Sequence, residues 1–181
     1  TWLDVVSVSG DSYTIDESKF NERANRLQEV VDYAKDYGLF VIINVHHDGA
    51  DGVTGSWLDV DASNQTGIRN AFEDLWGRIA AKFADYDKQL IFESMNEVME
   101  QGNYGTPSAT TCTNINALNQ IFVDTVRTGG ENTDRFLLIP GYNTNIDQTV
   151  KDCFVIPTDT ATKKIIVSCH FYDPYAFTLN D

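Results

Sequence analysis

Residues 90–97, Leu-Ile-Phe-Glu-Ser-Met-Asn-Glu, begin as a short apolar run and end in polar side chains. Three other segments have the same form, namely VIINVHH (41–47), FLLIPGYN (136–143) and IIVSCHFY (165–172). Apolar runs rich in aliphatic and β-branched residues are typical of strands that are buried on both faces of a parallel sheet. The sequence therefore predicts four parallel strands, at 39–45, 90–92, 136–139 and 165–167, each of which leads into polar residues.

Helical periodicity fills the segments before and between these strands. Apolar residues recur at helical spacing in three segments, and more weakly in a fourth: 17–37, 68–83, 115–126 and 146–153. Thr14 and Glu17 have the spacing of a capping box, and Gly38 is placed to end the first helix. No clear strand precedes that helix. Every connection is long enough for a crossover between parallel strands, which predicts an α/β fold.

Alternating strands and helices are compatible with a closed barrel or with a doubly wound open sheet. A dinucleotide-binding sheet has a glycine-rich turn after a strand, and no GxGxxG occurs here. Catalytic groups gathered from the carboxyl ends of several strands are typical of the (β/α)8 (TIM) barrel, so we predict that fold. A full barrel needs about 250 residues. We therefore expect residues 1–181 to form a partial catalytic domain that lacks the N-terminal and C-terminal strands, unless a second copy completes it.

The composition narrows the classes of partner. A net charge of −14 disfavours binding to nucleic acid or to anionic membranes, since both require a positive surface. It suits a neutral substrate such as a polysaccharide, although solubility alone also explains it. No apolar run is long enough to cross a bilayer, and no signal peptide is visible. Because neither CxxC nor HExxH occurs, we predict no metal and no cofactor.

The three cysteines do not make a disulfide framework. Cys169 lies in an apolar run, which predicts a buried core thiol. Cys112 and Cys153 both lie in loop-like segments. Their pairing stays open, because spacing does not show whether their Cα atoms come within bonding range.

Glu97 is the strongest candidate for a catalytic group. Alternation along the strand puts Glu93, Met95 and Glu97 on one face, with Glu97 at the mouth of the barrel. A partly enclosed carboxyl group keeps its proton more readily, as a general acid requires. Asn96 beside it can donate an amide hydrogen bond to a substrate hydroxyl. The alternative for Glu97 is a surface acid that starts the next helix. Glu93 is better explained as a buried structural carboxylate paired with a cation from a missing strand.

Histidines and aromatic residues follow the other strands. His46 and His47 end the strand in 41–47, where alternation turns them to opposite sides, and such donors can orient a sugar hydroxyl or a carboxylate. His170 and Tyr172 are two residues apart and share a face. Trp57, in the loop after the histidines, can stack on a sugar ring, although a loop tryptophan more often only packs its loop.

Taken together, VIINVHH, IFESMNE, LIPGYN and VSCHFYDPY resemble glycoside hydrolase family 5, especially its bacterial endoglucanases. The resemblance runs from YTIDE (13–17) to the C-terminus. An Asn-Glu pair alone is weakly specific, since many barrel glycosidases share it. The HH, NE and HFY clusters in this order are far more specific. The resemblance implies that the four strands are approximately the third to the sixth of eight.

The same resemblance implies roles for individual residues. Glu97 matches the general acid/base, and Asn96 matches the residue that binds the 2-hydroxyl of the reacting sugar. The other candidates match positions in the site or substrate contacts: His46, His170, Tyr172, His47 and Trp57. The family's arginine on the second strand, nucleophilic glutamate on the seventh and tryptophan on the eighth have no counterpart in residues 1–181.

The activity implied is that of a retaining endo-β-1,4-glucanase acting on cellulose-like β-glucan. Such an enzyme meets its polymeric substrate outside the cell, so an extracellular protein is expected, monomeric at full length. Two alternatives stay open: a non-catalytic carbohydrate-binding barrel, and the same chemistry on xyloglucan, mannan or xylan. Residues 1–181 expressed alone are expected to be inactive, because the second carboxylate of the pair is missing.

Overall fold

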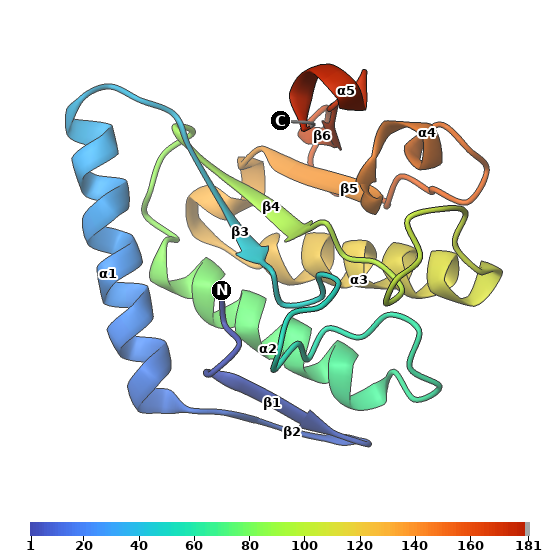
Figure 1. The fold of residues 1–181 in the computed structure, drawn as a ribbon. Coiled ribbons are helices and arrows are strands. Elements are labelled where there is room, and N and C mark those ends of the chain that lie inside the picture. The colour runs from blue at the N-terminus through green and yellow to red at the C-terminus, as the bar shows by residue number, and fades with distance from the viewer. Residues whose placement is uncertain (180–181) are drawn as a thin grey trace.

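A four-stranded parallel sheet forms the centre of the computed structural model, which describes residues 1–179 (Figure 1). Its strands are paired in chain order: β3 (Val41–His46), β4 (Leu90–Asn96), β5 (Leu137–Asn145) and β6 (Ile165–His170). Helix α2 (Thr66–Lys82) connects β3 to β4, and α3 (Ala109–Val126) connects β4 to β5. Figure 1 shows both helices on the same side of the sheet. This is the arrangement of a barrel wall, whereas a doubly wound sheet carries helices on both faces. The four predicted strands are confirmed.

Helix α1 (Glu17–Asp36) precedes β3 and begins differently from the prediction. Its N-cap is Asp16, whose side chain accepts a hydrogen bond from the Lys19 amide at 3.0 Å. The predicted capping box of Thr14 and Glu17 is wrong, because Thr14 is paired within a strand. Gly38 ends the helix as predicted, with a left-handed φ of 72°. The short elements η1 (Gly130–Asp134), α4 (Ile146–Thr149) and α5 (Tyr175–Thr178) complete the described structure.

An antiparallel hairpin that the sequence analysis missed precedes α1. It consists of β1 (Val6–Ser9) and β2 (Ser12–Ile15), joined by Gly10 and Asp11. Gly10 has a φ of 59°, which suits the tight turns that connect such strands. The hairpin packs on α2 at Gly67, where a side-chain Cβ would lie 2.3 Å from the Gly10 carbonyl oxygen. A glycine inside α2 is therefore required for this contact.

Trp76 of α2 lies at the centre of the core between the helices and the sheet. It is fully buried, with its ring centroid 4.5 Å from that of Phe122 on α3 and 5.5 Å from that of Phe92 on β4. Its indole N–H donates to the Ser94 carbonyl at 3.1 Å, so the burial leaves no polar atom of the ring unpaired. These contacts fix β4 against both helices, and hence the direction of its carboxyl end.

Cys112 and Cys153 form a disulfide, with their Cα atoms 5.5 Å apart. The bond ties the first turn of α3 to the segment after α4. Cys169, in contrast, is exposed, so the prediction of a buried core thiol is wrong. It lies on β6, which pairs only with β5 in the described part of the chain, and its neighbours Ile166 and Val167 are also 43% and 40% exposed.

Replacing both bridged cysteines by alanine is expected to destabilise the domain by about 2–4 kcal/mol, because the bond closes a long loop in the unfolded chain. The sequence separation of its cysteines is 41 residues. Thermal unfolding of wild type and of the double variant, each with and without reductant, measures the effect. Reductant should lower the Tm of wild type only; an equal response of both proteins would contradict the prediction.

Candidate active site

The carboxyl ends of the strands carry an unusual concentration of left-handed backbone. His47 follows β3 with a φ of 68°, and Glu97 follows β4 with a φ of 50°. On β5, Asn143 and Thr144 have φ values of 52° and 48°. Residues other than glycine rarely adopt such angles, and a β-branched threonine does so least readily. Strained backbone of this kind clusters at functional sites, which marks this end of the sheet.

Glu97 is held at the end of β4 by residues from two other strands. Its Oε1 lies 2.7 Å from Nδ1 of His170 at the end of β6. Its backbone N–H donates to Oγ1 of Thr144 on β5 at 3.0 Å. The side chains of Glu97 and His170 are 37% and 31% exposed, so the pair is open to a ligand but not fully solvated. A carboxyl group that is hydrogen-bonded to an imidazole can keep its position while it releases and takes up a proton.

Glu93 lies deeper, 5% exposed, and accepts hydrogen bonds from Nδ2 of Asn44 at 2.7 Å and from the Ser168 hydroxyl. Within residues 1–179 its partners are neutral donors, and pairing with a cation from a missing strand stays a prediction. Neutral donors on β3 and β6 already satisfy both of its oxygens, which explains how a carboxylate is tolerated there. Glu93 therefore joins three strands beneath Glu97.

His46 and His47 are in contact, with ring centroids 4.1 Å apart in an edge-to-face arrangement. The left-handed backbone of His47 ends the strand alternation, so the two rings do not lie on opposite sides as predicted. Burial lowers the pKa of His46, and the neighbouring His47 lowers it further, so the His46 imidazole is neutral at neutral pH. A neutral ring can both donate and accept a hydrogen bond at the site.

Asn96 directly precedes Glu97, and Tyr172 lies next to its partner His170. Asn96 lies opposite His46 in the strand register and is 4% exposed. Its side-chain amide forms no hydrogen bond within residues 1–179, which leaves it available to a ligand. The Tyr172 ring is 51% exposed and stands perpendicular to His170, with centroids 6.5 Å apart.

Trp57 is not available for stacking on a sugar. It is 5% exposed, and its indole N–H donates to Oδ1 of Asp48 at 2.8 Å. The predicted substrate contact is therefore wrong, because this tryptophan packs its own loop. Burial raises the pKa of Asp48, while hydrogen bonds from Trp57 and the Trp2 amide oppose that shift.

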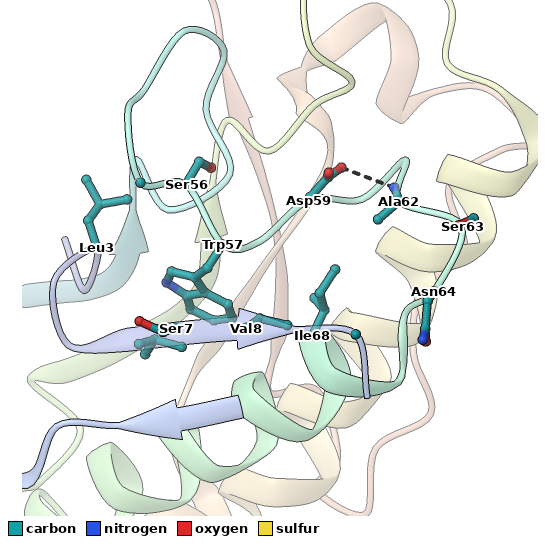
Figure 2. Close-up of a pocket in the computed structure, with 13 residues that line it drawn as sticks. Leu3, Ser7, Val8, Ser56, Trp57, Asp59, Ala62, Ser63, Asn64 and Ile68 are labelled. Atoms are coloured by element: carbon teal, nitrogen blue, oxygen red, sulfur yellow. Dashed lines mark hydrogen bonds between the residues drawn. The ribbon is translucent and has the colours of Figure 1, made fainter. Parts of the chain in front are cut away.

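Figure 2 shows the cavity that Trp57 lines, between strand β1 and residues 55–64. Its volume is about 500 Å³, and neither Glu97 nor His170 belongs to its walls. It is thus separate from the cluster at the strand ends.

Thr144 is a site residue that the sequence analysis missed. The motif LIPGYN ends at Asn143, and a threonine one residue beyond a polar strand end has no distinctive pattern. Within residues 1–179, no group of three or more His, Cys, Asp or Glu side chains is placed to hold a metal ion. None of the helices in that part of the chain has the length and apolar character of a membrane span.

Comparisons with known proteins agree with this geometry. The family model described as "Cellulase (glycosyl hydrolase family 5)" matches residues 4–181. Endoglucanase A of Paenibacillus barcinonensis is 49% identical over 179 residues, covering 93% of this chain and 44% of the relative. A family 5 xyloglucanase from Paenibacillus pabuli, solved with a ligand, has a TM-score of 0.86 and 48% identity, covering 97% of this chain and 50% of that one.

A second solved structure is a GH5-4 broad specificity endoglucanase from Ruminococcus champanellensis with bound cellotriose. Its TM-score is 0.84 at 37% identity, and the match covers 99% of this chain and 50% of that one. The chain thus spans about half the length of each of these three proteins. Glycoside hydrolases of this kind are (β/α)8 barrels, as the order of β3 to β6 indicates.

Proposed function

We propose that this chain, which belongs to the cellulase family (glycosyl hydrolase family 5), is the central part of a catalytic barrel that cleaves internal β-1,4-glucosidic bonds with retention of configuration. The observation that carries the proposal is the Glu97 carboxyl, held at a strand end 2.7 Å from the His170 imidazole and partly open to a ligand. Residues 1–181 would then supply strands three to six of the eight.

Glu97 acts as general acid and then as general base. In a retaining glycosidase, one carboxyl group protonates the leaving oxygen while a second, about 5–5.5 Å away, attacks the anomeric carbon. The first group then removes a proton from the water that releases the sugar. The proton that Glu97 transfers is carried on Oε2, while Oε1 accepts from Nδ1–H of His170 in both protonation states. A single tautomer of His170 thus keeps the carboxyl in place through both steps.

The nucleophile is assigned to a residue outside 1–181. Glu93 is a poor candidate, because it is 5% exposed and both of its oxygens are engaged by Asn44 and Ser168. Asn96, whose side-chain amide has no hydrogen-bond partner among residues 1–179, is assigned to bind the 2-hydroxyl of the reacting sugar. His46, His47 and Tyr172 supply further polar and aromatic contacts around it.

A neutral β-glucan is the substrate class that fits best. The net charge of −14 tolerates an uncharged polymer, and the relatives include proteins named endoglucanase and xyloglucanase. The disulfide favours an oxidising, extracellular location, where a polymeric glucan is found. We expect the complete catalytic domain to be a monomer without metal or cofactor.

Hydrolysis of a substrate panel by the complete catalytic domain tests this proposal. Carboxymethylcellulose and cello-oligosaccharides should be cleaved internally, and proton NMR should show the β-anomer of the new reducing end first. Xyloglucan, mannan and xylan, compared at equal concentration, measure the preference among sugars. An α-anomer as first product, or binding of glucan in gels without hydrolysis, would contradict the retaining enzyme; the second result would favour the non-catalytic carbohydrate-binding barrel.

A further inference from the structure

The backbone N–H of Glu97 donates a hydrogen bond to Oγ1 of Thr144 at 3.0 Å, and within residues 1–179 it has no other acceptor. Thr144 is fully buried, and its own φ is 48°. Glu97 has a φ of 50°. The carboxyl ends of the neighbouring strands β4 and β5 thus each carry a residue with left-handed backbone, and a hydrogen bond connects these two residues. A buried β-branched residue in this conformation needs surrounding contacts that impose it.

Thr144 lies in an irregular part of β5, where the pairing with β6 changes register. The register between β5 and β6 passes from Pro140 opposite Ser168 to Asn145 opposite His170, so β5 takes five steps where β6 takes two. The extra residues form a bulge in β5. Beside the hydrogen bond from Glu97 to Thr144, the backbone N–H of Asn143 donates to the Val98 carbonyl at 2.9 Å.

Glu97 is therefore held at two points. His170, at the end of β6, contacts its carboxyl group, and Thr144, in the bulge of β5, accepts from its main chain. The two supports lie at opposite ends of the same residue. Rotation of the main chain at Glu97 would move the carboxyl group away from His170, and a displacement of about 1 Å can cost about 10²-fold in rate.

We infer that Thr144 is a positioning residue for the acid/base carboxyl group of Glu97, acting through the hydrogen bond between its hydroxyl and the Glu97 amide. This rests on the proposed function of Glu97. Because Thr144 is fully buried, we assign it no contact with the substrate or the reacting atoms. Its effect should appear only in steps that need proton transfer by Glu97.

Thr144→Val and Thr144→Ser, made in the complete catalytic domain, separate positioning from packing. Valine keeps the shape of threonine and removes the hydroxyl, whereas serine keeps the hydroxyl. We expect Thr144→Val to lower kcat/KM for cellotetraose by about 10–100-fold. For 2,4-dinitrophenyl β-cellobioside, whose leaving group needs no proton, kcat/KM should fall less than about threefold. Thr144→Ser should behave like wild type on both substrates.

Thr149→Val is the matched control. Thr149 is also nearly buried, and its hydroxyl donates to the Asn145 carbonyl in the same region without touching Glu97. If Thr149→Val lowers kcat/KM at all, the loss should be equal for the two substrates. Thr144→Ala replaces the valine variant if the latter does not fold, as judged by Tm.

Equal losses on both substrates, or a serine variant as impaired as the valine variant, would overturn the inference. So would a valine variant with unchanged activity. These failures remain distinct from failure of the proposed function, because Glu97→Gln tests Glu97 directly. If Glu97→Gln shows the acid/base pattern and Thr144→Val does not, only the positioning role is lost.

Discussion

Replacing Glu97 by Gln is expected to lower kcat/KM for cello-oligosaccharides and carboxymethylcellulose by about 10²–10⁴-fold. Glutamine keeps the size of the side chain and can still meet Nδ1 of His170, but its amide does not protonate a leaving oxygen. Binding of cellotetraose should change little, because the Glu97 carboxyl group is needed for proton transfer more than for affinity. Steady-state kinetics and isothermal titration with the complete catalytic domain measure the two effects separately.

The same variant should cleave 2,4-dinitrophenyl β-cellobioside with kcat/KM close to wild type and a lowered kcat, because water is no longer activated in the second step. Added azide, which needs no general base, should restore kcat and yield a glycosyl azide. Turnover of carboxymethylcellulose at the wild-type rate would remove Glu97 from the mechanism.

Glu100→Gln is the control for loss of a nearby carboxylate. Burial alone would raise the pKa of Glu100, but hydrogen bonds from Thr111, Asn103 and Ser108 lower it to about 2. Glu100 is thus ionised at any working pH and has no proton to give. Because its folded pKa lies below the unfolded value, it stabilises the domain above about pH 4.5 and loses that contribution as the pH falls toward 2. Its replacement should lower stability at neutral pH and leave the leaving-group dependence unchanged.

The helices and strands were predictable because their apolar spacing is strong. The apolar runs at 39–45, 90–92 and 136–139 lie in or overlap β3, β4 and β5, but β4 and β5 continue to Asn96 and Asn145, beyond the predicted runs. The β1–β2 hairpin was missed because its strands are four residues long and rich in serine, although Gly10-Asp11 between alternating residues is a recognisable turn signal. The predicted cap at Thr14 failed for the same reason, since that residue belongs to the hairpin.

The site was predictable as a set of residue types but not as a set of contacts. Strand-end position located Glu97, His46 and His170, because parallel strands bring their carboxyl ends to one edge. It did not show that Trp57 is buried against Asp48, since a loop path depends on distant partners such as the Trp2 amide. Nor did it identify Thr144, because a left-handed backbone at a threonine runs against local preference and is imposed by the fold.

Arg135 has the largest expected effect on stability, and it lies at the opposite end of the sheet from Glu97. It is 1% exposed, just before β5, and uses all five of its N–H groups. Nε donates to Oδ1 of Asn132 at 2.7 Å, and the other nitrogens donate to four carbonyls, those of Asp87, Leu90, Phe83 and Tyr86. Its guanidinium also lies 4.6 Å from the ring centroid of Phe92.

Arg135→Met should lower the free energy of unfolding by about 3–5 kcal/mol, because methionine fills the space but leaves buried carbonyls without donors. The stability of Arg135→Lys should lie between those of wild type and Arg135→Met, since an ammonium offers three donors in place of a planar set of five. Urea unfolding of the complete catalytic domain measures both. Arg26→Met is the control: Arg26 is exposed, and its ion pair with Glu29 on the surface of α1 should contribute nothing measurable.

The destabilisation should not depend on pH in the neutral range. Burial lowers the pKa of Arg135 to about 10, and nearby Glu131 and Asp87 oppose the shift. Folded and unfolded chains therefore both bind the proton below about pH 9, and the loss in Arg135→Met should be equal at pH 5 and pH 8. A loss of less than about 1 kcal/mol would mean that water replaces the guanidinium at these carbonyls, and that Arg135 does not fasten the loops between α2 and β4 to the start of β5.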